Sequence, residues 1–264
     1  MIDKVSLIKR YASFIDADGD FIKALDQIFN VERSYEPAVT AFLPPDLCHV
    51  LTQIIETQTE LSVEKFGVFH EAERNRLAIK PAYAEVISES DYLSLLEISY
   101  NQKFAQLTHR DALGALLNLG VKRNKLGDIV VFEGGFQVAV DQTLEAYFIS
   151  SVEKIGRAGV TIKALSLSEA ICGEKQYRTV IGTVKSIRLD SVIALAYNLS
   201  RSEAQSLVEN GMVKVNHIIN TQVAYGPKEK ELLSVRGHGR FIVEEVLGTT
   251  KKDRIRLNLS VLIQ

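Results

Sequence analysis

The sequence predicts an α+β protein with more than one domain. At 264 residues, the chain is long enough for two or three small domains. Its 46% hydrophobic and 24% charged residues are ordinary for a globular protein that buries a core. Helical and strand-like apolar patterns alternate along the chain and change character near residues 75 and 184. We therefore expect three domains, at residues 1–75, 76–183 and 184–264.

The first segment predicts a small α+β domain of its own. Residues 20–29 carry apolar side chains at helical spacing. Pro44-Pro45-Asp46 opens a second helix, because proline is tolerated in the first turn, and its apolar positions are Leu47, Val50, Leu51, Ile54 and Ile55. Nothing in this segment indicates a chemistry.

The middle segment predicts the element order β-α-β-β-α-β. We expect strands at 93–100, 128–133, 136–140 and 160–167, with helices at 109–119 and 141–155. Gly134-Gly135 is a tight turn between the second and third strands. This order is that of a ferredoxin-like domain, which RNA-recognition domains share with many others. The fold by itself therefore does not give the function.

The last segment begins with two short helices and continues as strands. The first helix buries Leu189, Val192, Ile193 and Ala196. The second carries Ala204, Leu207 and Val208 and ends at Gly211. Apolar and polar residues alternate from Ile255 to Ile263, which predicts a strand with one packed and one wet face.

The charges are divided unequally along the chain. The net charge is −2, yet residues 185–264 hold 12 Lys and Arg against 8 Asp and Glu. The remaining residues are acidic overall. A basic module on an acidic body favours an anionic partner for the module.

Several side chains of the basic module suit phosphate binding. Arg201 and Gln205 lie four apart and share a helix face, and Ser200 with Glu203 has the spacing of a capping box. Lys214 and Asn216 face outward from a strand, while Arg236 and Arg240 bracket Gly237-His238-Gly239. Arginine binds phosphate bidentately, and glycine lets the backbone approach it. The alternative is a capped surface helix and a glycine hairpin with solvated arginines.

The order Arg188-Leu189-Asp190, Ser200-Arg201 and Val213-Lys214-Val215-Asn216 resembles the S-four domain, an αL RNA-binding module. The resemblance implies a C-terminal αL RNA-binding domain. Such domains carry Gly-Asp before the next strand, where this chain has Lys230-Glu231. Glu231 supplies a carboxylate in place of the aspartate, whereas Lys230 replaces the glycine.

Upstream motifs extend the likeness to the YlmH family. They are Phe69-His70-Glu71-Ala72-Glu73-Arg74, the run from Leu113 to Arg123, and Leu126-Gly127-Asp128-Ile129. The family combines an N-terminal domain, a ferredoxin-like RNA-binding domain and an S-four domain. The resemblance implies a bacterial cytoplasmic protein of the large ribosomal subunit that acts on stalled nascent chains beside peptidyl-tRNA. A link to cell division is also implied.

Other chemistries are disfavoured by the residues present. Asp16-Ala17-Asp18-Gly19-Asp20 resembles a calcium loop, but its glycine is fourth instead of sixth and Gln27 stands at position twelve. His70-Glu71-Ala72-Glu73 lacks the P-C-x-x-C of zinc deaminases. The two cysteines form no C-x-x-C motif and no disulfide framework, which is typical of a protein in a reducing cytoplasm. We expect no metal, no small-molecule cofactor, no secretory leader and no membrane span.

We therefore expect a non-catalytic RNA-binding protein that contacts ribosomal RNA and the large subunit. A second phosphate contact is expected in the loop Lys122-Arg123-Asn124-Lys125, for which a solvated turn is the alternative. Two other functions remain open: an RNA-modifying enzyme of the pseudouridine synthase or methyltransferase type, and a division-associated interaction protein. Asp190 is expected to orient its neighbours. The expected RNA-binding residues are Arg188, Ser200, Arg201, Gln205, Lys214, Asn216, Arg236, Arg240, Lys122, Arg123 and Lys125.

Overall fold

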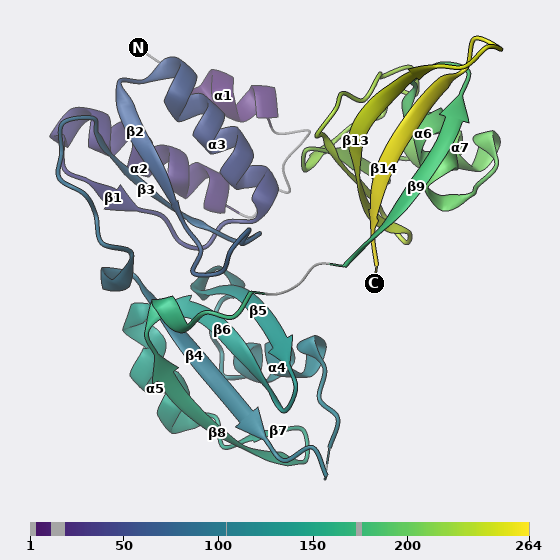
Figure 1. Ribbon diagram of the computed structural model, residues 1–264. Helices are drawn as coiled ribbons and strands as arrows, with labels where there is room; N and C mark the ends of the chain where they lie inside the picture. Colours follow the sequence, from purple (N-terminus) through teal and green to yellow (C-terminus); the bar gives the residue numbers. More distant parts are fainter. Residues whose placement is uncertain (1–3, 12–18, 104, 173–175, 264) are drawn as a thin grey trace. The chain divides into compact units, whose positions relative to one another are not determined.

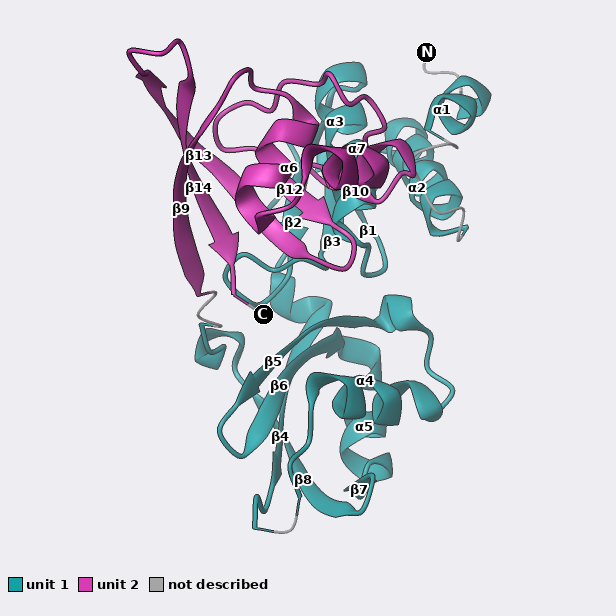
Figure 2. Ribbon diagram, turned by 90° about the vertical axis from the view of Figure 1, so that its right-hand side faces the viewer, with its two compact units in different colours: residues 1–173 teal, residues 174–264 magenta. Residues whose placement is uncertain are grey.

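The computed structural model describes residues 4–11, 19–103, 105–172 and 176–263. It divides into two compact units, residues 1–173 and 174–264 (Figure 2). The first unit holds the N-terminal and middle parts of the chain, and the second holds the basic module. Mixed helices and strands in several domains confirm the α+β fold class.

The N-terminal part of unit 1 packs helices against a small antiparallel sheet of strand order β1-β3-β2 (Figure 1). Helix α2 begins after Gly19, whose φ of 69° is left-handed, and α3 begins at Pro45, as expected for proline in the first turn. Asp16 and Asp18 of the rejected calcium loop lie outside the described residues. The elements are α1 (Lys4–Tyr11), α2 (Asp20–Ser34), β1 (Ala38–Val39), α3 (Pro45–Gln58), β2 (Leu61–Phe66) and β3 (Arg76–Pro81).

The middle part of unit 1 has the expected β-α-β-β-α-β order. Its sheet order is β5-β6-β4-β8-β7, in which the third strand of the motif lies between the first and the second, as in a split βαβ fold. Figure 2 shows α4 and α5 on one side of this sheet. The elements are β4 (Leu93–Tyr100), α4 (His109–Asn118), β5 (Leu126–Phe132), β6 (Gly135–Asp141), α5 (Glu145–Ser151), β7 (Lys154–Ile155) and β8 (Ala158–Leu165).

The helix expected over residues 141–155 is shorter than its apolar pattern suggested. The Asp141 carboxylate accepts a hydrogen bond from the Thr143 N–H, and this cap opens a 3-10 turn, η3 (Gln142–Leu144). Gly156, with a φ of 59°, turns the chain so that Ile155 pairs with Ala158. Only α5 is therefore α-helical.

The two faces of the middle sheet carry different cores. Leu96 and Ile98 point to the helices and pack with Leu116 and Phe148. Because strand residues alternate, Leu95 faces the other way. There the apolar cluster joins two sets of side chains: Phe42, Phe66, Phe69 and Ala78 from the N-terminal part, and Leu93, Leu95 and Ala139 from the middle sheet.

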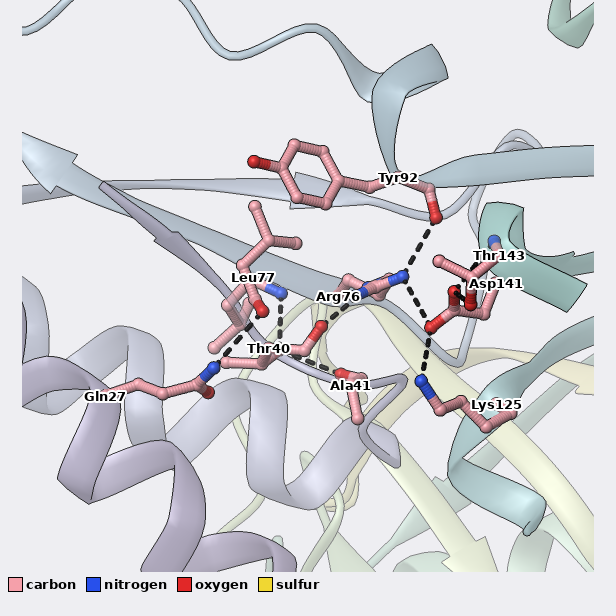
Figure 3. Close-up of polar contacts among 10 residues, drawn as sticks. Gln27, Thr40, Ala41, Arg76, Leu77, Tyr92, Lys125, Asp141 and Thr143 are labelled. Atoms are coloured by element: carbon pink, nitrogen blue, oxygen red, sulfur yellow. Dashed lines mark hydrogen bonds and ion pairs between the residues drawn. The ribbon is translucent and has the colours of Figure 1, made fainter. Parts of the chain in front are cut away.

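A buried ion pair ties the same two parts together. Arg76 of β3 lies 3.1 Å from the Asp141 carboxylate, which also pairs with Lys125 at 2.8 Å. Figure 3 shows the guanidinium reaching the carbonyls of Thr40 and Tyr92 as well, at 2.6 and 2.9 Å. Charges buried in this way are tolerated when every donor has a partner.

Unit 2 forms an antiparallel sheet of order β11-β10-β12-β13-β14-β9, with two helices packed on one face. Figure 1 shows β13, β14 and β9 as long neighbouring strands. Its elements are β9 (Tyr177–Val184), α6 (Leu189–Tyr197), α7 (Arg201–Glu209), β10 (Val213–Val215), β11 (Ile218–Ile219), β12 (Leu232–Val235), β13 (Gly239–Thr249) and β14 (Ile255–Leu262).

Two strands pair with a sheet on the other side of a domain boundary expected near residue 75 or 184. Strand β3 pairs with β1 and β2, so the N-terminal sheet continues past residue 75. Strand β9 pairs along its length with β14. Gly182 leaves room there for the Leu195 side chain of α6, a space that any Cβ would fill. Residues 177–183, expected in the middle domain, are therefore part of a strand of the C-terminal sheet.

Candidate nucleic-acid interface

Two arginines of unit 2 converge on one buried carboxylate. Asp190, in the first turn of α6, is 2% exposed. Arg201, the first residue of α7, donates to one of its oxygens at 2.5 Å, and Arg188 donates to the other at 3.3 Å. The two arginine side chains remain 57% and 39% exposed. The carboxylate therefore fixes both guanidiniums while part of each faces solvent.

The charge state of Asp190 follows from these contacts. Burial alone raises the pKa of the carboxyl, but the hydrogen bonds from Arg201 and Arg188 outweigh burial and hold the pKa below its ordinary value. Asp190 is thus ionised at neutral pH. This geometry agrees with the expectation that Asp190 orients its neighbours.

The first turn of α7 is closed by its own side chains. The Ser200 hydroxyl accepts from the Glu203 N–H, while the Glu203 carboxylate accepts from the Ser200 N–H at 2.9 Å. The expected capping box is present. Ser200 is therefore occupied within the helix terminus, and Gln205 donates to Glu209 at 2.7 Å on the exposed face.

The glycine turn after β12 lies close to α7. Gly237 and Gly239 have φ values of 83° and 109°, which only glycine adopts readily. His238 between them packs on the Tyr197 ring at 5.4 Å and helps to lower the pKa of Glu203, after the Ser200 hydrogen bonds. The turn therefore places Arg236 and Arg240 at the end of the sheet nearest the helix start.

Strand register sets Lys214 and Arg240 in one row. Lys214 of β10 is opposite Ser234 of β12, and Ser234 is opposite Arg240 of β13. Their strand neighbours Val213, Val215, Leu233, Val235 and Phe241 belong to the core under the helices. By alternation, the row faces away from α6 and α7. The residues expected to contact phosphate thus fall into two groups. Arg188 and Arg201 lie at the helices, and Lys214 and Arg240 lie on the opposite face of the sheet.

Asn216 has a structural role that its position in the motif did not suggest. It adopts a left-handed φ of 46°, accepts from the Leu232 N–H at 3.0 Å and donates to Glu231 at 3.2 Å. Glu231 also accepts from the Tyr225 hydroxyl and the Lys228 N–H. Asn216 therefore holds the turn that joins two strands, and its amide is already engaged.

The cationic loop of the middle part is tied to its own unit. Lys125 pairs with the buried Asp141 at 2.8 Å while its side chain stays 40% exposed, so a phosphate contact by Lys125 stays a prediction. Arg123 donates through Nη1 to the Leu126 and Gly127 carbonyls at 2.5 and 3.2 Å. Lys122 is exposed at the start of the 3-10 turn η2 (Arg123–Lys125). The three cations do not act as one solvated loop.

The helix-free face of the middle sheet differs from that of an RNA-recognition domain. Such domains stack bases on aromatic residues of their central strands. Here the central strands β4 and β6 present Leu95, Glu97, Gln137 and Ala139 on that face, and the N-terminal part covers Leu95 and Ala139. Glu97 pairs with Lys163 of β8 at 2.9 Å. The N-terminal part therefore covers part of this face, and none of these four residues is aromatic.

Together, an αL-type module with arginines fixed at its helix start and a ferredoxin-like domain define an RNA-binding class of protein. Residues 187–232 match the S4 domain, the S-four module of the sequence analysis. Residues 88–169 match the "Putative RNA-binding domain in YlmH", and residues 19–84 match the YlmH N-terminal domain.

The chain belongs to the YlmH family. It is 33% identical over 249 residues to the "Ribosome-associated protein quality control protein P2" of Bacillus subtilis (strain 168), covering 94% of this chain and 96% of the relative. It is also similar to the solved structure of the "Cell division protein ylmH from Streptococcus pneumoniae". That match has 33% identity and a TM-score of 0.51, and it covers 60% of this chain and 96% of the other.

No helix in the described part of the chain is long and apolar enough to cross a membrane. Sequence reasoning missed the pairing of Arg201 with Asp190, since the two residues lie in different helices. The spacing of eleven residues between a helix-start aspartate and the next helix-start arginine is the one feature that could have indicated it.

Proposed function

We propose that the protein is a non-catalytic RNA-binding factor of the bacterial cytoplasm. It docks on structured RNA of the large ribosomal subunit, next to peptidyl-tRNA, during quality control of stalled nascent chains. The printed name of the Bacillus subtilis relative supports this role, as do the matches to the S4 domain and the putative RNA-binding domain.

The observation that carries the proposal is the cluster of Arg188, Asp190 and Arg201, which we call the arginine clamp. Its buried carboxylate restricts two guanidiniums that are partly exposed. A restricted guanidinium loses less conformational entropy when it binds a phosphate bidentately. Phosphate contacts supply most of the affinity for structured RNA, which is recognised by shape and backbone. Function in this case consists of binding, without bond making or breaking.

Binding to purified large subunits tests the proposal. The double substitution Arg188→Gln/Arg201→Gln removes both positive charges, while the new amides still offer hydrogen-bond donors near Asp190. We expect binding to weaken by about tenfold or more, which corresponds to ~1.4 kcal/mol or more of binding free energy. The matched control, Lys252→Gln/Arg254→Gln, removes two positive charges from a turn of the same unit. The Arg254 side chain donates to the hydroxyl and the carbonyl of Thr183. Equal affinity of both variants, each shown to be folded, would contradict the role of the clamp.

The contacts of Asp190 do not favour an RNA-modifying activity at this site. A synthase-type mechanism needs a reactive aspartate, whereas Asp190 is bonded to two arginines. Mass spectrometry of ribosomal RNA and tRNA from a deletion strain separates the two functions. A modification that is missing from the deletion strain and restored by the gene would favour an enzyme.

A role in cell division is a second candidate, because the similar Streptococcus pneumoniae structure is named as a cell division protein. Under this alternative, natively purified protein carries a division protein and no ribosomal RNA. Under our proposal it carries large subunits, in amounts that fall in the clamp variant.

A further inference from the structure

Two arginines from distant parts of unit 1 donate to the same carbonyl oxygen. Arg74 Nε lies 3.3 Å from the Leu126 oxygen, and Arg123 Nη1 lies 2.5 Å from it. Arg74 comes from the loop before β3, and Arg123 opens η2 before β5. The fold therefore brings two guanidiniums side by side although 49 positions separate them in the sequence.

Further backbone contacts hold both groups in place. Arg74 Nη2 donates to the Phe42 carbonyl at 3.0 Å, and Arg123 Nη1 donates also to Gly127. The side-chain hydrogen bonds of Arg123 use Nη1, which leaves the Nε and Nη2 edge without a hydrogen-bond partner among the described residues. That edge is the side-on fork that binds a phosphate or carboxylate bidentately.

The carboxylates around the pair act on it without a direct bond to either guanidinium among the described residues. Asp128 is the anion that acts on both arginines, and its oxygens accept from the N–H groups of Glu73 and Arg74 at 2.6 and 3.2 Å. Asp20 and Asp46 influence Arg74 from beyond ion-pair distance. Within the described ranges, neither arginine forms an ion pair. Two half-buried cations therefore lie together without a directly bonded anion.

Electrostatics agrees with this geometry. Burial, and then the nearby Arg74 charge, lower the pKa of Arg123 to about 10. Burial and the Arg123 charge likewise lower the pKa of His109, at the start of α4. Asp128 acts in the opposite direction on all three groups, and its charge is weaker than burial in each case. At neutral pH the two arginines therefore carry the positive charge that would attract an anion.

We propose that Arg123, with Arg74 beside it, binds a phosphate of the RNA backbone on unit 1. This inference rests on the proposed function and adds a second contact, separate from the arginine clamp. It also gives the N-terminal part a role in binding. That part packs on Leu95 and Ala139 of the middle sheet and supplies Arg74. RNA therefore follows the edge marked by η2 and the start of α4 instead of the sheet face.

The salt dependence of large-subunit binding tests the site. In Arg123→Gln we expect about fivefold to tenfold weaker binding, and a slope of log affinity against log salt that is shallower by about 1, because one phosphate contact is lost. Arg33→Gln is the matched control: it removes the same charge from an exposed position of unit 1 that contacts Asn30. A folded Arg123→Gln protein with wild-type affinity and slope would overturn the site.

A second measurement uses the wild-type chain, so it remains decisive if Arg123→Gln does not fold. Inorganic phosphate is added at constant ionic strength against chloride, and the side-chain N–H signals of the arginines are followed by NMR. We expect the Arg123 Nε–H signal to shift and that of Arg33 to remain in place. A stationary Arg123 signal rejects the site.

The two proposals fail in different ways. If the clamp variant loses subunit binding while Arg123→Gln does not, the phosphate site is wrong and the RNA-binding function stands. If neither variant loses binding, the proposed function fails. A phosphate-induced shift of Arg123 would then show an anion site without an RNA partner, which contradicts our assignment of its ligand.

Discussion

Asp190 illustrates how a single buried side chain can prepare others for binding. An ionised carboxylate at 2% exposure is costly unless charged hydrogen bonds compensate it. Arg188 and Arg201 supply them, and the Ser191 hydroxyl lies 3.4 Å from the same carboxylate. Asp190 restricts both arginine side chains before any RNA is bound. Their loss of conformational entropy on binding RNA is therefore smaller.

Replacing Asp190 by asparagine tests this role through its pH dependence. Because the folded pKa lies below the ordinary value of 3.8, the charged hydrogen bonds stabilise the fold above about pH 4 and are lost as the pH falls through the folded pKa. We expect Asp190→Asn to lower the unfolding free energy of unit 2 by about 1.5–3 kcal/mol at pH 7. The difference from wild type should shrink in acid.

Urea unfolding at pH 7 and at pH 3 measures this difference. Glu244→Gln is a suitable control, since Glu244 also has a lowered pKa but pairs at the surface with Lys230. Glu244→Gln should lower the unfolding free energy at pH 7 by less than Asp190→Asn does. A pH-independent deficit in Asp190→Asn would mean that shape, and not charge, explains the effect.

Lys230 shows how the expected glycine turn survives without glycine. Its φ of 66° is the left-handed conformation that glycine adopts easily and other residues adopt at a cost. The following Glu231 keeps its contacts with Tyr225, Asn216 and the Lys228 N–H. The carboxylate network thus holds this loop with Lys230 in the left-handed conformation.

At the scale of elements, α7 divides its residues between packing, capping and binding. Ala204 and Val208 are fully buried, Ser200 and Glu203 close the first turn, and Arg201 reaches Asp190. Ser200 was expected to contact RNA, yet its hydroxyl serves the cap. We expect its influence on binding to be indirect, through the position of Arg201.

Substitutions at Ser200 separate these roles. Ser200→Ala removes the cap and should destabilise α7 by about 1 kcal/mol, whereas Ser200→Asn retains a good N-cap and should cost little. Hydrogen exchange of the α7 amides measures both effects. If Ser200→Asn lost RNA affinity while keeping wild-type exchange, the hydroxyl itself would contact RNA and our interpretation would be wrong.

At the scale of the whole molecule, the N-terminal and middle parts of unit 1 share an apolar cluster and a buried ion network. Phe42 packs close to Gly127, where a Cβ would collide with its ring, and Arg76 links β3 to Asp141 of β6. The N-terminal and middle parts therefore share a core. The sheet face that an isolated ferredoxin-like domain could offer to RNA is partly covered.

The ion network should control the stability of unit 1 alone. Removing one partner of a buried pair leaves an uncompensated charge, so Arg76→Met should cost about 3–5 kcal/mol. Arg76→Met/Asp141→Leu should cost less than the sum of the two single changes. Lys163→Met, which breaks the surface pair with Glu97, should cause no measurable change.

Hydrogen exchange resolves the two units in this experiment. Amides of β3 to β6 should lose protection in Arg76→Met, while those of β13 and β14 keep it. A simultaneous loss of protection in both units would show that they unfold as one cooperative body, contrary to their division into two compact units.

The sequence by itself determined most elements, since they follow from local rules. Apolar spacing gave the helices that contain Leu51, Val192 and Ala204, and the Ser200–Glu203 spacing gave the cap. The element order gave the ferredoxin-like part, and the motifs gave the family, which the matches confirm. These features depend on residues a few positions apart, so the chain encodes them directly.

Only the tertiary structure decided how the predicted contact residues are partnered. Lys125 pairs with Asp141 and Asn216 accepts from Leu232, each 16 positions away. Arg74 and Arg123, 49 positions apart, donate to the same Leu126 carbonyl. The covered sheet face and the pairing of β9 with β14 are decided in the same way. Burial and register bring distant residues together, and spacing along the chain carries no record of such contacts.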